Sequence, residues 1–293
     1  MRPSLIAAVV VVHATSVAVT SLHAQQQRRT EVTINDTAVT PENLTSSRDG
    51  TVYFGSMAKG TIYRAAPGAS QAEPWILASA AGLTRVLGVL ADDSTNTLWV
   101  CQNATGGQTA LRAFDLKSGG AKGTYPLPPN GGVCNDIAVA ADGAVYVSES
   151  FRGRVHRLKT GATQLEVWAA SEQMNVIDGL AFLADGSLYV NDFATGNLFR
   201  IPVNADGSAG ALVAIETSIP LVRPDGLRSV GPRTLIQAEQ QGRVTELTVS
   251  GNRAEVRVLR DGLPRASGVT MVGNSALVLV ELTKAVVVPY PSR

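Results

Sequence analysis

The chain has 293 residues, and its 25 Lys and Arg residues nearly balance its 24 Asp and Glu residues, for a formal net charge of +1. Binding to phosphate backbones needs a clustered basic face, which the sequence lacks, so a nucleic-acid partner is not expected. The 28 glycines, and the lack of long stretches with the 3.6-residue apolar period of a helix, favour an all-β fold.

Residues 1–24 have the features of a secretory signal peptide. Met1 and Arg2 provide a positive start, residues 5–20 are mostly apolar, and Ala24 closes a cleavage site. Polar residues interrupt the apolar run, and no later run is long enough to span a bilayer. We therefore expect a secreted or periplasmic protein without membrane attachment after cleavage, with a membrane-retained N-terminus as the alternative. Residues 25–293 would then form one domain.

An internal repeat organises the rest of the chain. Each unit contains an apolar strand with a bulky central residue, and successive central residues are 46, 47, 43, 47 and 42 positions apart. These residues are Tyr53, Trp99, Tyr146, Tyr189, Ile236 and Val278. This period is typical of β-propeller blades, so the sequence predicts a six-bladed propeller with four-stranded antiparallel blades.

The turns agree with this division. Asp49-Gly50, Asp142-Gly143 and Asp185-Gly186 each precede a bulky strand, as tight hairpins between the first two strands of a blade require. The sixth unit ends one strand short of a complete blade. The segment from Glu31 to Asp36 is the only uncommitted strand, and we expect it to pair with the strand around Ala285 to Val288 and to close the ring.

The first strand of each propeller blade lines the central axis. Counting back 11 positions from each bulky residue reaches the start of that strand in every unit. The residues found there are Glu42, Gly88, Asn135, Asp178, Asp225 and Ser267. Three carboxylates and one amide at equivalent positions are expected to converge in one mouth of the ring.

Such converging carboxylates would repel one another and take up protons unless a cation lay between them. Glu42, Asn135, Asp178 and Asp225 are therefore predicted metal ligands. A flexible set of oxygen donors suits calcium best, with magnesium and manganese as alternatives. Zinc is a poorer alternative, because it usually takes His or Cys ligands. For each residue alone, a hydrogen-bonding role at a strand start is the other interpretation.

Four motifs resemble those of the SMP-30/gluconolactonase/regucalcin family, over essentially the whole mature chain. They are PEN at 41–43, NDIAVAADG at 135–143, DGLAFLADGSLYVND at 178–192 and PDGL at 224–227. The resemblance implies a six-bladed propeller with one axial divalent metal that hydrolyses small lactones or esters. It implies that Asp225 is both a ligand and the general base, and that Asn135 and Asp136 lie beside the metal and the substrate.

Two positions depart from the family pattern. The family usually has Asn where this chain has Asp178, which makes the predicted site more negative. An Arg often precedes the Asn-Asp pair by two residues in the family, and Val133 stands there in this chain. Recognition of a polyhydroxylated sugar lactone is therefore not expected from the pattern, whereas hydrolysis of lactones in general is.

The predicted chemistry has two competitors. In a non-catalytic binding propeller the metal would only hold the blades together, and in a strictosidine-synthase-like condensation a carboxylate would act without metal. An open pocket lined by Asp136, Asn191, Asp192 and Glu239 would favour a hydrolase with these residues as substrate contacts. His156 is the only histidine after residue 24, and as it falls on a third strand, away from the axis, a serine triad or histidine dyad is not expected.

Two cysteines remain after signal cleavage. Cys101 follows the bulky strand of the second unit, and Cys134 directly precedes Asn135 in the third. Neighbouring blades could bring them together, and an exported protein can keep a disulfide. The alternative is a pair of buried thiols that pack as small apolar groups.

Overall fold

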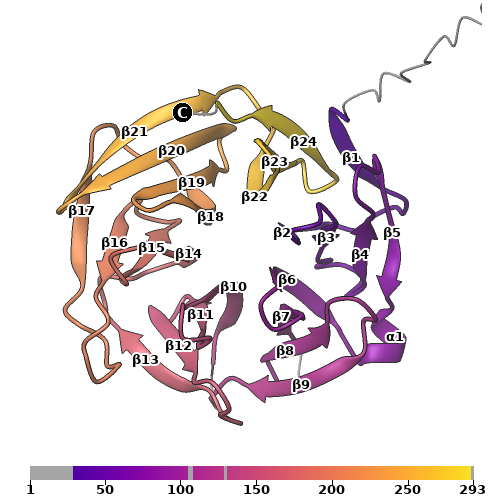
Figure 1. The fold of residues 1–293 in the computed structure, drawn as a ribbon, viewed down its shortest axis with the longest axis horizontal. Coiled ribbons are helices and arrows are strands. Elements are labelled where there is room, and N and C mark those ends of the chain that lie inside the picture. Colours follow the sequence, from indigo (N-terminus) through magenta and orange to yellow (C-terminus); the bar gives the residue numbers. More distant parts are fainter. Residues whose placement is uncertain (1–28, 105–107, 129–130, 292–293) are drawn as a thin grey trace, which may run out of the picture.

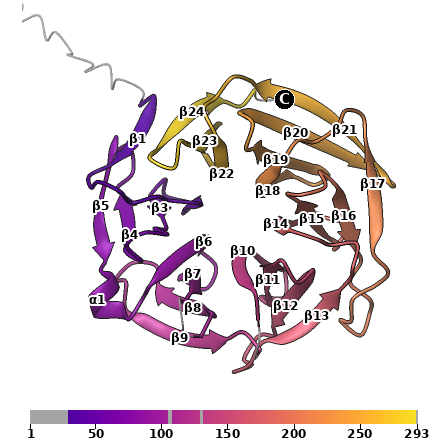
Figure 2. The same cartoon turned by 180° about the vertical axis from the view of Figure 1, so that it is seen from behind.

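The computed structural model describes residues 29–104, 108–128 and 131–291; the predicted signal peptide lies outside them. The described chain is almost entirely β, and its sheets are arranged in a ring about a common axis (Figures 1 and 2). One short helix, α1 (Ala78–Ala81), lies at the periphery of the ring. No helix in the described ranges is long and apolar enough to cross a membrane.

Two of the sheets have four antiparallel strands in sequence order. The first comprises β6 (Arg85–Asp92), β7 (Thr97–Asn103), β8 (Ala110–Asp115) and β9 (Ala121–Pro126). The second comprises β10 (Val133–Val139), β11 (Val145–Ser150), β12 (Arg154–Leu158) and β13 (Glu166–Ala170). In both, the first strand is innermost and the last lies on the outside of the ring (Figure 1).

A third sheet has eight strands and joins two such groups through their outer strands. One group is β14 (Ile177–Phe182), β15 (Leu188–Asp192), β16 (Leu198–Ile201) and β17 (Val213–Thr217). The other is β18 (Pro224–Gly231), β19 (Thr234–Glu239), β20 (Arg243–Ser250) and β21 (Arg253–Arg260). The outer strands β17 and β21 are parallel, with Glu216 opposite Arg253.

The fourth sheet brings the two ends of the described chain together. Its strands are β2 (Leu44–Ser46), β3 (Val52–Phe54), β4 (Ile62–Ala65), β5 (Gln71–Ile76), β1 (Glu31–Ile34), β24 (Lys284–Pro289), β23 (Ser275–Val280) and β22 (Ala266–Val272). Strand β1 pairs antiparallel with β24, and Val32 lies opposite Ala285, which is the pairing expected from the sequence.

Strand β1 differs from the expectation in two ways. It ends at Ile34, and the following Asp36 turns away so that its carboxylate binds Lys59 and Tyr63. Its other edge also pairs with β5, in parallel, so that Thr33 lies opposite Gln71. The terminal strand therefore covers two sheet edges, both of which would otherwise be free for pairing with another chain.

The bulky repeat residues all lie in the second strand of their group, between the innermost strand and the third. The Asp-Gly turns before them contain glycines with positive φ, such as Gly50 at 91° and Gly143 at 83°. Residues with a side chain rarely adopt this backbone conformation, which explains why glycine occupies this position of the turns. The apolar core lies mainly between adjacent strand groups: Tyr146 of β11, for example, packs edge-on against Phe182 of β14.

Candidate metal centre

The predicted ligand positions lie at one end of the innermost strands. Asp178, Asp225 and Ser267 are the second residues of β14, β18 and β22, Asn135 lies in β10, and Glu42 precedes β2. The pairing register of the first and second strands shifts at this point in five groups: at 86–89, 134–137, 177–180, 224–227 and 266–269. Such bulges release residues from the ladder and redirect their side chains, here at five of the six repeat positions.

Three carboxylates meet in this mouth of the ring. Each of Glu42, Asp178 and Asp225 offers one oxygen, and these oxygens lie within 4.8 Å of one another. The amide nitrogen of Asn135 donates to the Asp178 carboxylate at 2.9 Å and to the Ser150 hydroxyl at 3.0 Å. Asn135 therefore fixes the orientation of Asp178 and joins the cluster.

Several oxygen atoms of this cluster are buried and have no hydrogen-bond partner among the described residues. They are Oε2 of Glu42, Oδ1 of Asn135, Oδ1 of Asp178 and Oγ of Ser267. Buried polar atoms in native proteins are usually paired, so unpaired acceptors at one place indicate a partner that the chain itself does not supply. The donor set is oxygen alone, which suits calcium or another hard cation.

The electrostatics of the cluster point the same way. Burial raises the pKa of Asp178 well above its usual range, and the charges of Asp225 and Asp136 add to the effect. Burial likewise raises the pKa of Glu42, with Asp178 as the next cause, and that of Asp225, with Glu42 as the next. Without a cation the cluster therefore retains protons to higher pH than free carboxylates do.

Gly88, the equivalent position in the second group, has a packing role. A Cβ atom built on this glycine would lie 2.0 Å from the backbone oxygen of Asn135. Only glycine allows β6 to approach β10 so closely. The absence of a donor side chain in this group is therefore a condition for bringing Asn135 into place.

A cavity of about 220 Å³ lies above the carboxylates and contains Glu42, Asn135, Asp178, Asp225 and Ser267 in its lining. The wall around this polar floor is largely apolar, consisting of Met57, Leu87, Val133, Phe151, Val176, Phe193 and Leu282. Ser150, Gln240, Arg85 and Arg265 complete it. The mouth is therefore open, with oxygen atoms at its floor and mostly apolar groups at its wall.

The four residues expected to bind substrate do not line this cavity. Asn191 is buried, and its amide donates to the backbone oxygen of Asp225 at 2.7 Å and to Gln237 at 3.0 Å. Asp136 is also buried; its carboxylate accepts a bidentate ion pair from Arg228, at 2.6 and 3.1 Å, and a bond from Asn43. Both residues therefore support the site from within the ring instead of facing the cavity.

The other two, Asp192 and Glu239, hold the loops that lead into the ligand strands. Asp192 accepts from the backbone N–H groups of Asn175 and Val176, and Glu239 accepts from that of Val222 at 2.7 Å. These loop residues come two or three positions before Asp178 or Asp225. Asp192 and Glu239 bind loop backbone instead of substrate because the N–H groups of these loops need acceptors inside the protein.

The same kind of side-chain contact to loop backbone occurs in two further groups. In each group it is made by the residue three positions after the bulky residue. Glu149 accepts from the backbone of Gly132, which lies three positions before Asn135. Ser56 donates its hydroxyl to the backbone oxygen of Val39, three positions before Glu42, at 2.6 Å. We refer to Ser56, Glu149, Asp192 and Glu239 as the loop clamps. The same counting that located the ligands could have located them.

His156 lies outside the cavity, as the sequence suggested. It is fully buried, and its Nε2 lies 2.6 Å from Oε2 of the loop clamp Glu149. It therefore supports the loop before Asn135. Close by, Cys101 of β7 and Cys134 of β10 are joined in a disulfide with a Cα separation of 5.2 Å, so a covalent bond links two neighbouring sheets directly beside Asn135.

The sequence analysis missed the arginine and the aromatic residues of the wall. Arg265 lies two positions before Ser267, which is the repeat position that Val133 occupies before Asn135. Counting this offset in every unit would have found it. Phe193 is supported from outside by Arg223, whose guanidinium carbon lies 4.5 Å from the ring centroid. Wall residues of this kind have no distinctive motif, so only the structure identified Phe193 and Phe151.

No protein-family model matches the sequence, and no curated protein sequence matches it. Solved structures do resemble the fold. A gluconolactonase from Xanthomonas campestris has a TM-score of 0.65 and 16% identity, covering 91% of this chain and 88% of that one. Virginiamycin B lyase from Staphylococcus aureus, in a catalytically inactive histidine-to-alanine form with quinupristin, gives 0.66 and 17%, covering 88% and 83%.

Regucalcin from Agrobacterium tumefaciens, described as a calcium-binding protein, has a TM-score of 0.61 and 14% identity, covering 89% of this chain and 95% of that one. These similar structures are β-propellers whose activities differ from one another. At such low identity the likeness concerns the fold alone. The chain therefore has a β-propeller fold that resembles gluconolactonase, regucalcin and streptogramin lyase structures.

Proposed function

We propose that this chain is an exported, six-bladed β-propeller that hydrolyses small lactones or esters with the help of a divalent cation, most readily calcium. The strand order supports the blade count, because two sheets have four strands and the other two each join two groups of four. The single observation that carries the function is the cluster of Glu42, Asp178 and Asp225, with its unpaired oxygens, at the floor of an open cavity.

The residues fit a hard cation. Carboxylate oxygens of Glu42, Asp178 and Asp225 and the amide oxygen of Asn135 would hold it, and the Ser267 hydroxyl lies in the same lining. A bound cation would supply polarisation of the ester carbonyl and stabilise the charge that develops on its oxygen. It would also neutralise the repulsion that burial and mutual proximity create among the three acids.

The chain itself supplies the other parts of the reaction. Asp225 would accept the proton of the attacking water, as a general base within reach of the cavity. Asn135 would keep Asp178 in its orientation through the 2.9 Å hydrogen bond. The loop clamps would hold the entry of three ligand strands rigid, because they bind backbone atoms two or three residues before Asn135, Asp178 and Asp225.

The wall of the cavity supports a restricted substrate class. Val133, Phe193 and Leu282 offer no hydrogen bonds to hydroxyl groups, and Asn191 and Asp192 are committed to internal partners. A lactone or ester with few hydroxyl groups therefore fits this wall better than a sugar lactone does.

The test is hydrolysis of a panel of aliphatic lactones, aryl esters and gluconolactone by the purified protein. We expect turnover of the less polar compounds, its loss in chelator and its recovery on addition of calcium. Asp206→Asn, which alters an exposed carboxylate on an outer hairpin, is the matched control and should retain full activity. Absence of metal-dependent turnover for every compound would refute the hydrolase.

Two other functions are less well supported by the site. A propeller that only binds a ligand does not need a general base in its pocket, yet Asp225 lines the cavity. A lyase that depends on a histidine, as the inactive histidine-to-alanine form of the similar lyase implies for that enzyme, would need one at the cavity. The buried His156 does not line it.

A further inference from the structure

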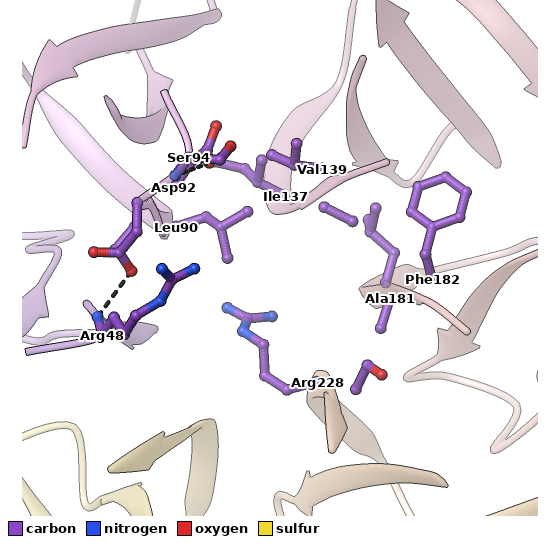
Figure 3. Close-up of a pocket in the computed structure, with 14 residues that line it drawn as sticks. Arg48, Leu90, Asp92, Ser94, Ile137, Val139, Ala181, Phe182 and Arg228 are labelled. Atoms are coloured by element: carbon purple, nitrogen blue, oxygen red, sulfur yellow. Dashed lines mark hydrogen bonds between the residues drawn. The ribbon is translucent and has the colours of Figure 1, made fainter. Parts of the chain in front are cut away.

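The opposite end of the ring contains a second cavity, of about 320 Å³. It is lined by the far ends of the innermost strands β6, β10, β14 and β18 and by the turn after β2. Figure 3 shows two arginines there, Arg48 and Arg228, whose guanidinium groups point into the same space. This volume lies at the lower end of the range for small-molecule sites.

Arg228 is held in place by hydrogen bonds to buried partners. Its two terminal nitrogens bind Asp136 at 2.6 and 3.1 Å, and its side chain is only 12% exposed. Its Nε is buried and has no hydrogen-bond partner in the described part of the chain. The ion pair with Asp136 therefore fixes the guanidinium plane of Arg228 at the wall of the cavity.

In Figure 3 the guanidinium group of Arg48 points toward that of Arg228. The backbone N–H of Arg48 donates to the Asp93 carboxylate at 2.8 Å, which fixes the turn, whereas no partner of its guanidinium is found among the described residues. Two guanidinium groups that share a cavity repel each other, and only the charge of Arg228 is neutralised by a bidentate partner.

The cavity also contains two acidic residues, and both are engaged by the protein. Asp92 accepts from the backbone and hydroxyl of Ser94 and from the hydroxyl of Thr95. These bonds outweigh its burial and lower its pKa, so it remains charged but directed at its own turn. Asp93 accepts from the Arg48 backbone. Neither carboxylate binds the Arg48 guanidinium.

The remaining wall is apolar. Leu90, Ile137, Val139, Leu180 and Phe182 line the cavity, and Figure 3 shows Ile137, Val139 and Phe182 on the side away from Arg48. The cavity thus has a cationic side and an apolar side. This division matches a molecule with a carboxylate at one end and an apolar body at the other.

We propose that this second mouth binds a small monocarboxylate with an apolar body. Its carboxylate accepts hydrogen bonds from the Arg48 guanidinium on the cationic side of the cavity, and its apolar part packs on Ile137 and Phe182. The site is distinct from the candidate metal centre, since none of its lining residues lines the cavity above Glu42, Asp178 and Asp225.

The test measures binding of 3-phenylpropionate to the full mature protein by isothermal titration calorimetry, with 3-phenylpropanamide as the neutral analogue. We expect saturable binding of the acid, binding about tenfold weaker for the amide, and a similar loss for the acid with Arg48→Gln. A tenfold loss corresponds to about 1.4 kcal/mol, which is within reach of one lost charge-assisted hydrogen bond. Arg48 is exposed, so its substitution should not disturb folding.

Arg85→Gln is the matched control, because Arg85 is an exposed arginine at the rim of the first cavity. It should leave the affinity unchanged, and so should calcium. Equal binding of acid and amide, no saturable binding of the acid, or an affinity that depends on calcium or Arg85 but not on Arg48 would each overturn the proposal. These outcomes are independent of any hydrolase activity at the first mouth.

Discussion

Two sets of three carboxylates lie near the same end of the strand groups and differ in how their oxygens are used. Glu149, Asp192 and Glu239 are fully buried and accept hydrogen bonds from loop backbone atoms and neighbouring side chains. Glu42, Asp178 and Asp225 approach one another to within 4.8 Å, and two of them retain a buried oxygen without a partner among the described residues.

The difference shows how a buried acid reveals its role. A carboxylate that the protein satisfies with its own N–H groups and cations stabilises the fold, and nothing else is needed to explain it. When the protein buries a carboxylate beside other carboxylates, burial and the neighbouring charges raise its pKa. Such a carboxylate destabilises the fold unless a ligand compensates. Both sets consist of Asp and Glu residues, and five of the six are buried while Glu42 is partly buried, so the partners of the oxygens are the main distinction between the sets.

The largest effect is expected at a loop clamp. Glu239→Ala leaves the backbone N–H of Val222 and the side chains of Arg243 and Thr245 without their acceptor. We expect a loss of about 3–5 kcal/mol in the free energy of unfolding, the usual cost of breaking a buried charged pair. Denaturant unfolding in metal-free buffer measures it.

The matched substitution in the other set is Asp178→Ala, measured in the same buffer. It removes one of three repelling charges, so we expect a free energy of unfolding that is unchanged or higher. An equal loss for the two variants would show that the two sets do not differ in the way proposed.

The next effect separates the base from a ligand within the candidate centre. Asp225→Asn keeps an oxygen donor but cannot accept a proton, so lactone turnover should fall about a hundredfold or more, with a moderate loss of calcium affinity. Asp178→Asn also keeps a donor. It should retain much of the activity while calcium binds more weakly, because one negative charge is lost.

Calcium titration and lactone hydrolysis of these two variants, compared at saturating calcium, decide between the roles. If both variants lose activity equally and only in proportion to metal occupancy, Asp225 is a ligand and does not act as a base.

The smallest effect concerns pH. Since Glu42, Asp178 and Asp225 have pKa values raised above those of the unfolded chain, the folded protein holds more protons from about pH 4 upward. Without metal, stability should therefore fall as pH rises through the raised pKa values, and the melting temperature should be a few degrees lower at neutral pH than at mildly acidic pH.

Calcium should reverse this loss at neutral pH, and the pH dependence should be weaker in Asp178→Asn. Thermal melts with and without calcium provide the measurement, at about 2–4 °C for each kcal/mol in a domain of this size. A metal-free melting temperature that rises steadily toward neutral pH would contradict the electrostatic description of the cluster.

The periodic repeat in the sequence was enough to predict part of the fold and part of the candidate site. The bulky residues recur in every unit and the Asp-Gly turns in three of them, and the pairing of Glu31–Ile34 with β24 follows from the strand that the last unit lacks. The offset of 11 residues brought Glu42, Asp178 and Asp225 to one height, because equivalent residues of a closed ring lie at the same level along its axis. The signal peptide lies outside the described residues and stays a prediction.

The tertiary structure decided which partner each side chain has. Position along a strand sets the height of a residue but not the direction of its side chain after a bulge, so Asp136 could be placed beside Asn135 but not against Arg228, 92 residues further on. Asp192 and Glu239 looked like substrate contacts because their backbone partners belong to loops with no sequence signal. Hydrogen bonds between distant segments form only when the ring closes, and they determine which acids support the fold and which are left for a ligand.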